Sequence, residues 1–413
     1  MTDTTTTGTT GASRAGRAPG VGQDAPRPDG LPKVQGRFGF ASDLFAEGML
    51  WGHTARSPHP YARVVAVDIG PALRIGGVYA VLTADDVPGS RVFGLEIPDQ
   101  PVLAREIVRY MGEPVAVVAA DHPDTARRAA AAIRVTYEAL DPLVDVRAAA
   151  EAPPVHPDGN VFRHLVIRRG DPGAVADGAT TVEGVYEVGM QDQAPLGTEA
   201  GLAVPRPDGG IDLFVSTQAL HNDLEQVSAC VGLPEDKVHI QLAGVGGAFG
   251  AREDVSLQIH LALLALHTGR PVKMVYDRQE SFFGHVHRHP AQMWFRHRAA
   301  ADGTLLGVEA RLWFDGGAYA STSAAVLANA SCFAAGPYRV ENVHIDGWAL
   351  RTNNPPCGAM RGFGAVQTCI GHEAQMDKLA AALGVDPVEL RLRNALAPGD
   401  RLVTGQVITG AAP

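Results

Sequence analysis

Cysteine is scarce in this sequence and is never closely spaced. Four cysteines occur among 413 residues (Cys230, Cys332, Cys357 and Cys369), and no two of them form a Cys-x-x-Cys pair. This spacing excludes a disulfide framework and cysteine ligation of zinc or of an iron–sulfur cluster. A chain with so few and so dispersed thiols is typical of a reducing compartment, and we expect a cytoplasmic protein.

Two further absences concern membranes and nucleic acids. No apolar run reaches the roughly 18 residues that a membrane-spanning helix needs, so no membrane partner is expected. Basic residues number 35 against 45 acidic ones, which gives a formal net charge of −10 at pH 7. Because phosphate backbones are bound by basic surfaces, this balance excludes nucleic acid as the main partner. The 46% hydrophobic and 19% charged residues describe a globular protein.

Composition changes along the chain predict four segments. Residues 1–33 are rich in Thr, Gly, Pro and Arg, and we predict a disordered tail. Residues 34–147 alternate short β-rich runs with turns and include an apolar run at 114–119, which predicts a self-contained α/β unit. Residues 148–180 mix Pro and Gly with few apolar runs, which predicts a linker. Residues 181–413 predict a larger α/β domain.

The most informative stretch is a glycine-dense turn over residues 243–254, which carries one aromatic ring, Phe249, ahead of an apolar helix predicted over 255–266. Glycine lets the main chain approach a ligand and adopt positive φ, and amides ahead of a helix point toward anions. A phosphorylated cofactor would suit such a loop. The loop is neither a G-x-G-x-x-G motif nor a P-loop, since no Gly-Lys-Ser/Thr follows. A tight strand-to-helix turn without a ligand explains the same residues.

A second loop, residues 351–364, again places glycine around a charge and a ring, Arg361 and Phe363, before a helix. Arginine suits bidentate contact with phosphate or carboxylate, and an aromatic ring can pack on a flat substrate. Alternatively, the prolines of this segment stiffen an ordinary turn, in which Arg361 pairs with a carboxylate and Phe363 fills the core.

Together the two loops resemble those of the molybdenum-binding subunit in the xanthine dehydrogenase and aldehyde oxidase family of molybdenum hydroxylases. Residues 56–63 and 110–117 resemble the family's a/b hammerhead domain, and residues 214–218 and 288–290 resemble its first molybdopterin-binding domain. The resemblance covers residues 33–407, and the second loop is most similar to bacterial xanthine dehydrogenases. It implies an α/β (α+β) fold, with a small hammerhead domain followed by a mixed-sheet molybdopterin-binding domain and without the family's second molybdopterin domain.

The resemblance also implies roles for individual residues. Gln218 corresponds to a glutamine beside the apical oxygen of molybdenum, where it would act as a catalytic hydrogen-bond partner; a glutamine that caps a strand is the alternative. Phe363 corresponds to the aromatic residue that packs against the substrate ring. No side chain is assigned as a direct ligand of the metal. The cofactor-binding positions are Gln218, Gly247, Phe249, Gly250 and Arg361.

Two residues bear on the substrate. Glu253 corresponds to a glutamate that hydrogen-bonds the purine in xanthine enzymes, where aldehyde oxidases have an apolar residue, so it is assigned to catalysis and substrate binding. The alternative is a carboxylate stabilised by the dipole of the following helix. Asn329 falls where the animal xanthine enzymes place a substrate-orienting arginine. Asparagine forms hydrogen bonds but does not neutralise an anion, so recognition by Asn329 must differ.

Three histidines alternate over residues 285–289. An extended segment would place His285, His287 and His289 on one face, as metal ligation requires. A polar turn that enters the next strand explains the same residues, and the family has Arg-His-Pro at this place. We favour the turn.

The implied function is molybdenum-cofactor-dependent hydroxylation of a purine-like N-heterocycle, xanthine or hypoxanthine, with iron–sulfur clusters and FAD on partner subunits. The family's catalytic base is a glutamate in a Gly-Glu-Pro context, and none follows Arg361; Glu113 has this context but belongs to the hammerhead unit. The chain therefore resembles the N-terminal half of a catalytic subunit, with a further chain supplying the other half. An aldehyde or other heterocycle oxidoreductase, or an inactive half that only binds partners, is the alternative.

Overall fold

The structure, a computed structural model, describes residues 26–173 and 178–410, and these form two units. The described part of the first unit, which ends at Gly39, contains helix α1 (Gly30–Val34), within the segment predicted as a tail. Residues 1–25 of that tail lie outside the described residues, as do residues 174–177 of the predicted linker. All further elements belong to the second unit, which begins at Phe40.

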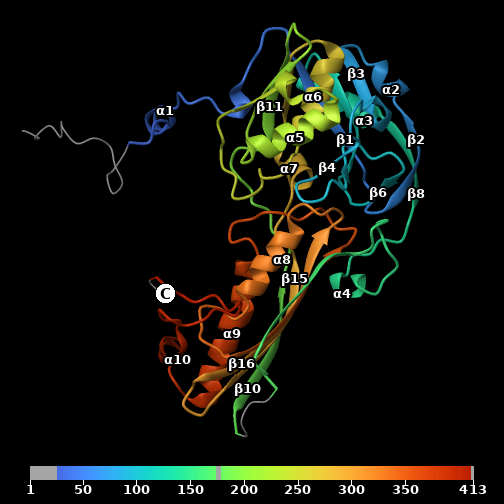
Figure 1. Cartoon of the computed structure of the whole chain (residues 1–413). Helices are drawn as coiled ribbons and strands as arrows, with labels where there is room; N and C mark the ends of the chain where they lie inside the picture. Colours follow the sequence, from blue (N-terminus) through green and yellow to red (C-terminus); the bar gives the residue numbers. More distant parts are fainter. Residues whose placement is uncertain (1–25, 174–177, 411–413) are drawn as a thin grey trace, which may run out of the picture. The chain divides into compact units, whose positions relative to one another are not determined.

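A seven-stranded mixed sheet forms one half of this unit (Figure 1), with strand order β13-β12-β11-β14-β1-β7-β3. In chain order its strands are β1 (Leu50–Arg56), β3 (Val78–Thr83), β7 (Pro114–Ala120), β11 (Ala200–Pro205), β12 (Ile211–Val215), β13 (Val238–Leu242) and β14 (Val272–Val275). Helices α5 (Leu220–Val231) and α6 (Gln258–Thr268) pack on this sheet.

The seven-stranded sheet shows that residues 34–147 are not self-contained, contrary to the prediction. Strand β1 pairs in parallel with β14, with Leu50 opposite Val272 and Trp51 opposite Lys273. Helix α6 contacts β3 and β7 as well as β11, β12 and β14. The physical reason is a shared core, because fully buried strands such as β7 need apolar cover on both faces, and α6 supplies part of it.

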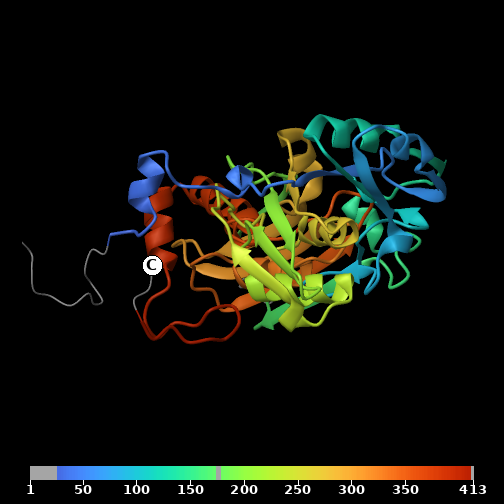
Figure 2. The same cartoon turned by 90° about the horizontal axis from the view of Figure 1, so that it is seen from above.

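Three other strands of the N-terminal region form a sheet with order β6-β2-β8, and β4 (Val92–Phe93) pairs with β5 (Gln100–Pro101) in a separate two-stranded sheet. The strands of the three-stranded sheet are β2 (Ala62–Asp68), β6 (Ile107–Val108) and β8 (Arg134–Ala139). Helix α3 (Pro123–Ala132) begins with proline at its first position, its N-cap residue is His122, and it contacts β1 and β7. Figure 2 shows α3, in teal, beside these strands.

A five-stranded sheet of order β10-β15-β16-β17-β9 forms the other half of the unit. Its strands are β9 (Val161–Arg169), β10 (Thr180–Val188), β15 (Ala291–Ala299), β16 (Leu305–Gly317) and β17 (Asn342–Arg351). The predicted linker at 148–180 is therefore wrong in its centre, because β9 pairs with β17 along most of its length. Strand β9 lies at the edge of the sheet and is nowhere fully buried, and its longest apolar run, residues 165–167, is too short to predict a strand.

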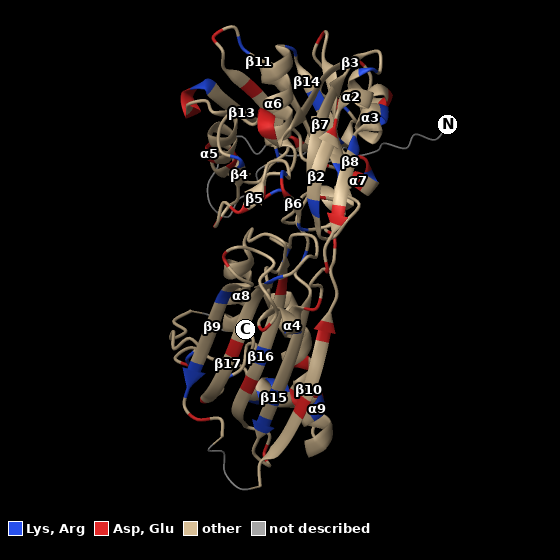
Figure 3. Ribbon diagram, turned by 90° about the vertical axis from the view of Figure 1, so that its right-hand side faces the viewer, with Lys and Arg blue, Asp and Glu red and all other residues tan. Residues whose placement is uncertain are grey.

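Helices cover one face of this second sheet, and one short helix lies on part of the other face. The buried side chains of β15, β16 and β17 pack with those of α8 (Ser323–Cys332) and α9 (Ala365–Leu383) in one core. Helix α4 (Val146–Ala149) packs with Trp313 and Trp348. Figure 3 shows acidic and basic residues along the same strands, and some of them pair, as Arg298 does with Glu309 at 2.8 Å. The mixed sheets confirm the predicted α/β (α+β) class.

The shorter elements connect these layers. They are α2 (Gly70–Leu73), α7 (Arg278–Gly284), α10 (Pro387–Asn394), β4 (Val92–Phe93), β5 (Gln100–Pro101), and the 3-10 turns Ala41–Asp43, Ala84–Asp86 and Glu235–Lys237. None of the helices within residues 26–173 and 178–410 combines the length and apolar character that crossing a bilayer requires.

Candidate functional site

The glycine-rich loop lies between β13 and α6 and closes on the end of β12. Gln218 follows that strand, and its side-chain Oε1 accepts hydrogen bonds from the amides of Gly250 (3.2 Å) and Arg252 (3.4 Å). The main-chain amide of Gln218 donates to the Arg252 carbonyl oxygen (2.8 Å). Because Oε1 is held by the loop, the exposed Nε2 group of Gln218 is left as a donor, with no hydrogen bond to any described residue.

The buried side chain of Arg252 holds the same loop through hydrogen bonds to main-chain oxygens. Its side chain is 3% exposed and donates to the carbonyl oxygens of Gly247 (3.1 Å) and Gly197 (2.5 Å). The guanidinium also lies 3.6 Å from Glu199, which is buried as well. Burial lowers the pKa of Arg252, and the charge of Glu199 opposes that shift. In the sequence Arg252 is only one member of a charged run, since nothing in the local pattern distinguishes a buried arginine from an exposed one.

The two predicted loops are in direct contact. The Arg361 amide donates to the Phe249 carbonyl oxygen at 2.9 Å. Gly250 lies so close to the second loop that a Cβ atom there would be 2.7 Å from the carbonyl carbon of Ala359. Phe249 and Phe363 both adopt positive φ, +54° and +44°, which is uncommon outside glycine and indicates a backbone fixed by its surroundings. The two turns, far apart in the chain, therefore meet in the folded protein.

The second loop presents one charged and one aromatic side chain. Arg361 is exposed, and its guanidinium makes no hydrogen bond or ion pair with any residue in the described ranges, so it is available to an anion. Phe363 is half-buried and packs against the core of the second sheet. Asn329 donates from Nδ2 to the Phe363 carbonyl oxygen at 2.6 Å. Asn329 thus supports the loop in this structure, in addition to any contact with a substrate.

Acidic groups gather beside the first loop. Oε2 of Glu253 and Oδ1 of Asp254 are shielded from solvent and have no hydrogen-bond partner among the described residues. Burial raises the pKa of Glu253. Burial also raises the pKa of Asp254 to about 7, and the charges of Glu253 and Glu96 act in the same direction. The helix-dipole alternative for Glu253 is wrong, because α6 begins only at Gln258 and the dipole acts within the first turn.

The three alternating histidines do not share one face. His285 and His287 stack with ring centroids 5.3 Å apart, and both lie beside Asp192. His289 instead contacts the hydroxyl of Ser323 at 2.9 Å. The segment is not a regular strand, which explains why the period-two expectation fails at His289.

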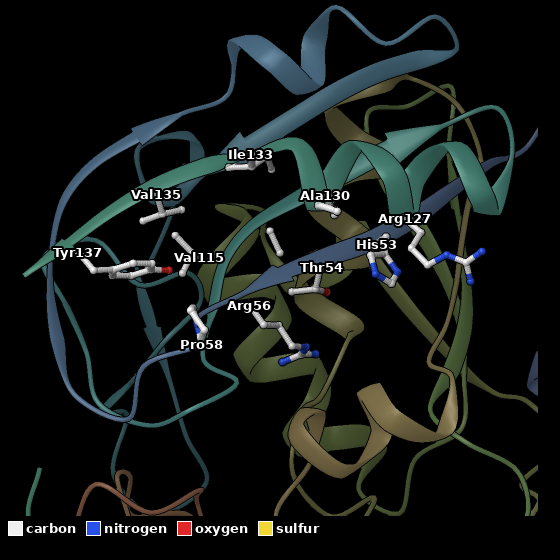
Figure 4. Close-up of a pocket in the computed structure, with 12 residues that line it drawn as sticks. His53, Thr54, Arg56, Pro58, Val115, Arg127, Ala130, Ile133, Val135 and Tyr137 are labelled. Carbon is white, nitrogen blue, oxygen red and sulfur yellow. The ribbon is translucent and has the colours of Figure 1, made fainter. Parts of the chain in front are cut away.

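One well-defined cavity lies elsewhere, in the hammerhead region (Figure 4). It has a volume of about 410 Å³ and its lining includes His53, Arg56, Arg127 and Tyr137. None of its lining residues belongs to either glycine loop. Arg56 is already engaged there with Glu280 at 3.2 Å, so this cavity offers no equivalent of the chemistry at the loops.

Comparison with known proteins agrees with this geometry. Residues 35–141 match the aldehyde oxidase and xanthine dehydrogenase a/b hammerhead domain, and residues 155–395 match the molybdopterin cofactor-binding domain. The chain is 39% identical over 391 residues to the nicotinate dehydrogenase large molybdopterin subunit of Eubacterium barkeri, covering 94% of this chain and 92% of that protein. The chain belongs to the aldehyde oxidase and xanthine dehydrogenase family.

Two other relatives are longer than this chain. A probable xanthine dehydrogenase subunit of Bacillus subtilis is 39% identical, and the match covers 91% of this chain and 51% of that protein. The solved aldehyde oxidoreductase of Desulfovibrio gigas superposes with a TM-score of 0.88 at 32% identity, covering 92% of this chain and 44% of that one. The chain thus spans about half the length of these two relatives. It shares their oxidoreductase family and contains a molybdopterin cofactor-binding domain.

Proposed function

We propose that this chain is the molybdenum-carrying subunit of a hydroxylase that acts on a purine-like N-heterocycle. The observation that carries the proposal is the contact between the two loops, which brings the Gln218 amide group, the Arg361 guanidinium and the Glu253 carboxylate to one region. The guanidinium of Arg361 and the Nε2 group of Gln218 donate no hydrogen bond to any described residue. The glycines of the first loop expose main chain rather than side chains beside them. These features suit an anionic, phosphorylated pterin.

Bound molybdopterin would supply the two-electron redox chemistry of hydroxylation, and the protein would position and polarise the reactants. Gly247 and Gly250 would let the loop take the turn that presents its main chain to the pterin, because both have positive φ. At Gly250 the missing side chain also makes room for Ala359 of the second loop. Arg361 would compensate the negative charge of the cofactor. Gln218 would donate from Nε2 while its Oε1 stays bonded to the loop.

Glu253 supports the choice of substrate class. Its shielded, unpartnered Oε2 costs free energy unless a ligand donates to it, and the N–H of a heterocycle is such a donor. An aldehyde without an N–H group would leave the oxygen unsatisfied. A carboxylate-bearing substrate would in addition meet the negative charge of Glu253 beside Asp254 and Glu96.

A second candidate is nicotinate. The relative that this chain covers nearly completely is named nicotinate dehydrogenase, and Asn329 could hydrogen-bond a carboxylate in place of an arginine. That relative and the Bacillus subtilis one are both named as subunits, which supports partner subunits for this chain. We propose that these partners carry iron–sulfur clusters and FAD.

The test compares the assembled enzyme carrying Glu253→Val with the same enzyme carrying Glu235→Val. The second variant is the control, because it makes the same substitution at an exposed glutamate. Loss of a hydrogen bond to a charged group costs about 1.5–3 kcal/mol, so kcat/KM for hypoxanthine should fall roughly 10- to 100-fold. Turnover of benzaldehyde should fall less, and Glu235→Val should change neither. An equal loss for both substrates would remove the purine assignment, and faster turnover of nicotinate than of hypoxanthine by the unaltered enzyme would favour the second candidate.

A further inference from the structure

Asp192, His285 and His287 form a compact, largely buried cluster behind the second loop. Oδ2 of Asp192 lies 3.0 Å from Nε2 of His285 and 3.3 Å from Nε2 of His287. The two histidine side chains are 1% and 5% exposed, and that of Asp192 is 14% exposed. One donor atom from each residue lies within 4.8 Å of the others, and this is the arrangement that a shared cation requires.

The remaining polar atoms of the three side chains point to partners that orient them. Oδ1 of Asp192 accepts from the Ala194 amide at 2.6 Å, which turns Oδ2 toward the histidines. Nδ1 of His285 lies 3.4 Å from Oε1 of Glu199. Nδ1 of His287 lies 3.5 Å from the Pro356 carbonyl oxygen. Each imidazole therefore has an oxygen within 3.5 Å of the ring nitrogen that faces away from the cluster, and the contact of His285 with Glu199 is a close charge contact rather than an aligned hydrogen bond. Oxygens in this position are usual around metal-bound histidine.

The distances also match a tetrahedral metal. Zinc binds imidazole nitrogen and carboxylate oxygen at about 2.0–2.2 Å, which separates neighbouring ligand atoms in a tetrahedron by about 3.3 Å. The Asp192 contacts, 3.0 and 3.3 Å, lie near this value. The Phe282 carbonyl oxygen, 3.0 Å from Nε2 of His287, is placed to accept a hydrogen bond without metal or to complete the coordination with it.

We infer that Asp192, His285 and His287 bind a divalent, zinc-class metal ion, distinct from the molybdenum of the cofactor. Two imidazoles and one carboxylate are the donor set that zinc favours over calcium or magnesium. Neither ring nitrogen of His285 and neither oxygen of Glu199 makes a hydrogen bond of acceptable geometry with a described residue, although they lie close together. Oδ2 of Asp192 also lacks a hydrogen-bond partner among the described residues, and a cation bound between Oδ2 and Nε2 of His285 would satisfy both atoms.

The ion would stabilise the second loop through the main chain at His287 and Arg288, which is hydrogen-bonded to it. The His287 amide donates to the Pro356 carbonyl oxygen (3.2 Å), and the Gly358 amide donates to the His287 carbonyl oxygen (2.9 Å). Arg288, the next residue, donates to the Arg361 carbonyl oxygen at 2.9 Å. Metal binding at His285 and His287 would therefore stiffen the segment that holds Arg361, without contact between the ion and the substrate.

The experiment measures metal directly in the purified full chain. After incubation with zinc and exhaustive dialysis, elemental analysis should find one zinc ion per chain in the unaltered protein. Asp192→Asn and His287→Gln should each retain none above the buffer, whereas His164→Gln should retain the full amount, because His164 pairs with Asp346 as a two-residue contact. Cobalt(II) should give the intense visible bands of tetrahedral coordination, saturating at one equivalent. Zinc should raise the melting temperature of the unaltered protein and of His164→Gln, but not that of Asp192→Asn or His287→Gln.

The cobalt titration keeps the test valid if a variant fails to fold, because it needs only the unaltered protein. Absence of tetrahedral cobalt bands and of retained zinc in that protein would overturn the inference. Equal zinc content in the unaltered protein and in a folded His287→Gln variant would overturn it as well. The cluster would then be an ion pair of protonated His285 with Asp192 and Glu199. Since zinc is counted separately from molybdenum, either outcome is independent of the proposed function.

Discussion

Replacing Gly250 by alanine tests whether the two loops support each other. Gly250 has φ +107°, and a Cβ atom would lie 2.7 Å from the Ala359 carbonyl carbon and 2.9 Å from the Met360 Cα. The Ala359 carbonyl oxygen would lie closer still, and ordinary contacts begin at 3.4 Å, so the second loop would have to move by about 1 Å. The same movement would stretch the hydrogen bond from the Arg361 amide to the Phe249 carbonyl oxygen.

Two contributions set the size of the effect. A left-handed backbone costs an L-residue about 1–2 kcal/mol, and this applies wherever glycine with such φ is replaced. Displacing the second loop adds the weakening of about two hydrogen bonds, roughly 0.5–1.5 kcal/mol each. One is the bond from Arg361, and the other is donated to the Ala359 carbonyl oxygen by Gln193. We therefore expect Gly250→Ala to lower the free energy of unfolding by about 2–5 kcal/mol.

Gly399→Ala is the matched control, since Gly399 has φ +96° and no atom within 4 Å of a Cβ position. It should cost only the backbone contribution, about 1–2 kcal/mol. Urea unfolding of both variants and of the parent gives the comparison, and molybdenum content of the assembled enzyme gives a second measurement. Equal destabilisation by the two alanines would refute the reasoning, because it would mean that displacing the second loop does not change the free energy of unfolding.

Two further predictions concern residues around the site. Because its folded-state pKa is raised to about 7, Asp254 contributes stability that is present at low pH and is lost as the pH rises from about 4 through about 7. Asp254→Asn should therefore reduce the fall in melting temperature over this pH range. The reduction should be partial, because the pKa of Glu113 is also raised to about 7. Asp236→Asn, at an exposed position, should leave the pH dependence unchanged, and parallel curves for all three proteins would contradict the prediction. Asn329→Ala should lower the free energy of unfolding by about 1 kcal/mol, because the Phe363 carbonyl oxygen loses its donor, and an unchanged urea midpoint would show that this bond contributes nothing.

Local sequence signals determined much of the secondary structure. Helix α5 (Leu220–Val231) ends where Gly232 adopts the left-handed conformation, and the side chain of Asp386 caps α10 ahead of Pro387. Such signals act within one or two turns of chain, through capping hydrogen bonds and apolar periodicity. The start of α6 differs from the prediction. The helix begins at Gln258 rather than at 255, because the side-chain Oε1 of Gln258 accepts hydrogen bonds from the amides of Ser256 (2.8 Å) and Leu257 (2.9 Å).

The sequence by itself determined that two glycine loops, each with a ring and a charge, precede helices, and their residue types pointed to a large anionic cofactor. Only the tertiary structure decided that Phe249 and Arg361 meet, that Asn329 holds the second loop, and that Asp192 joins two of three histidines. These contacts join segments far apart in the chain. They depend on how whole sheets and helices pack, a balance of many weak interactions that no short stretch of sequence encodes.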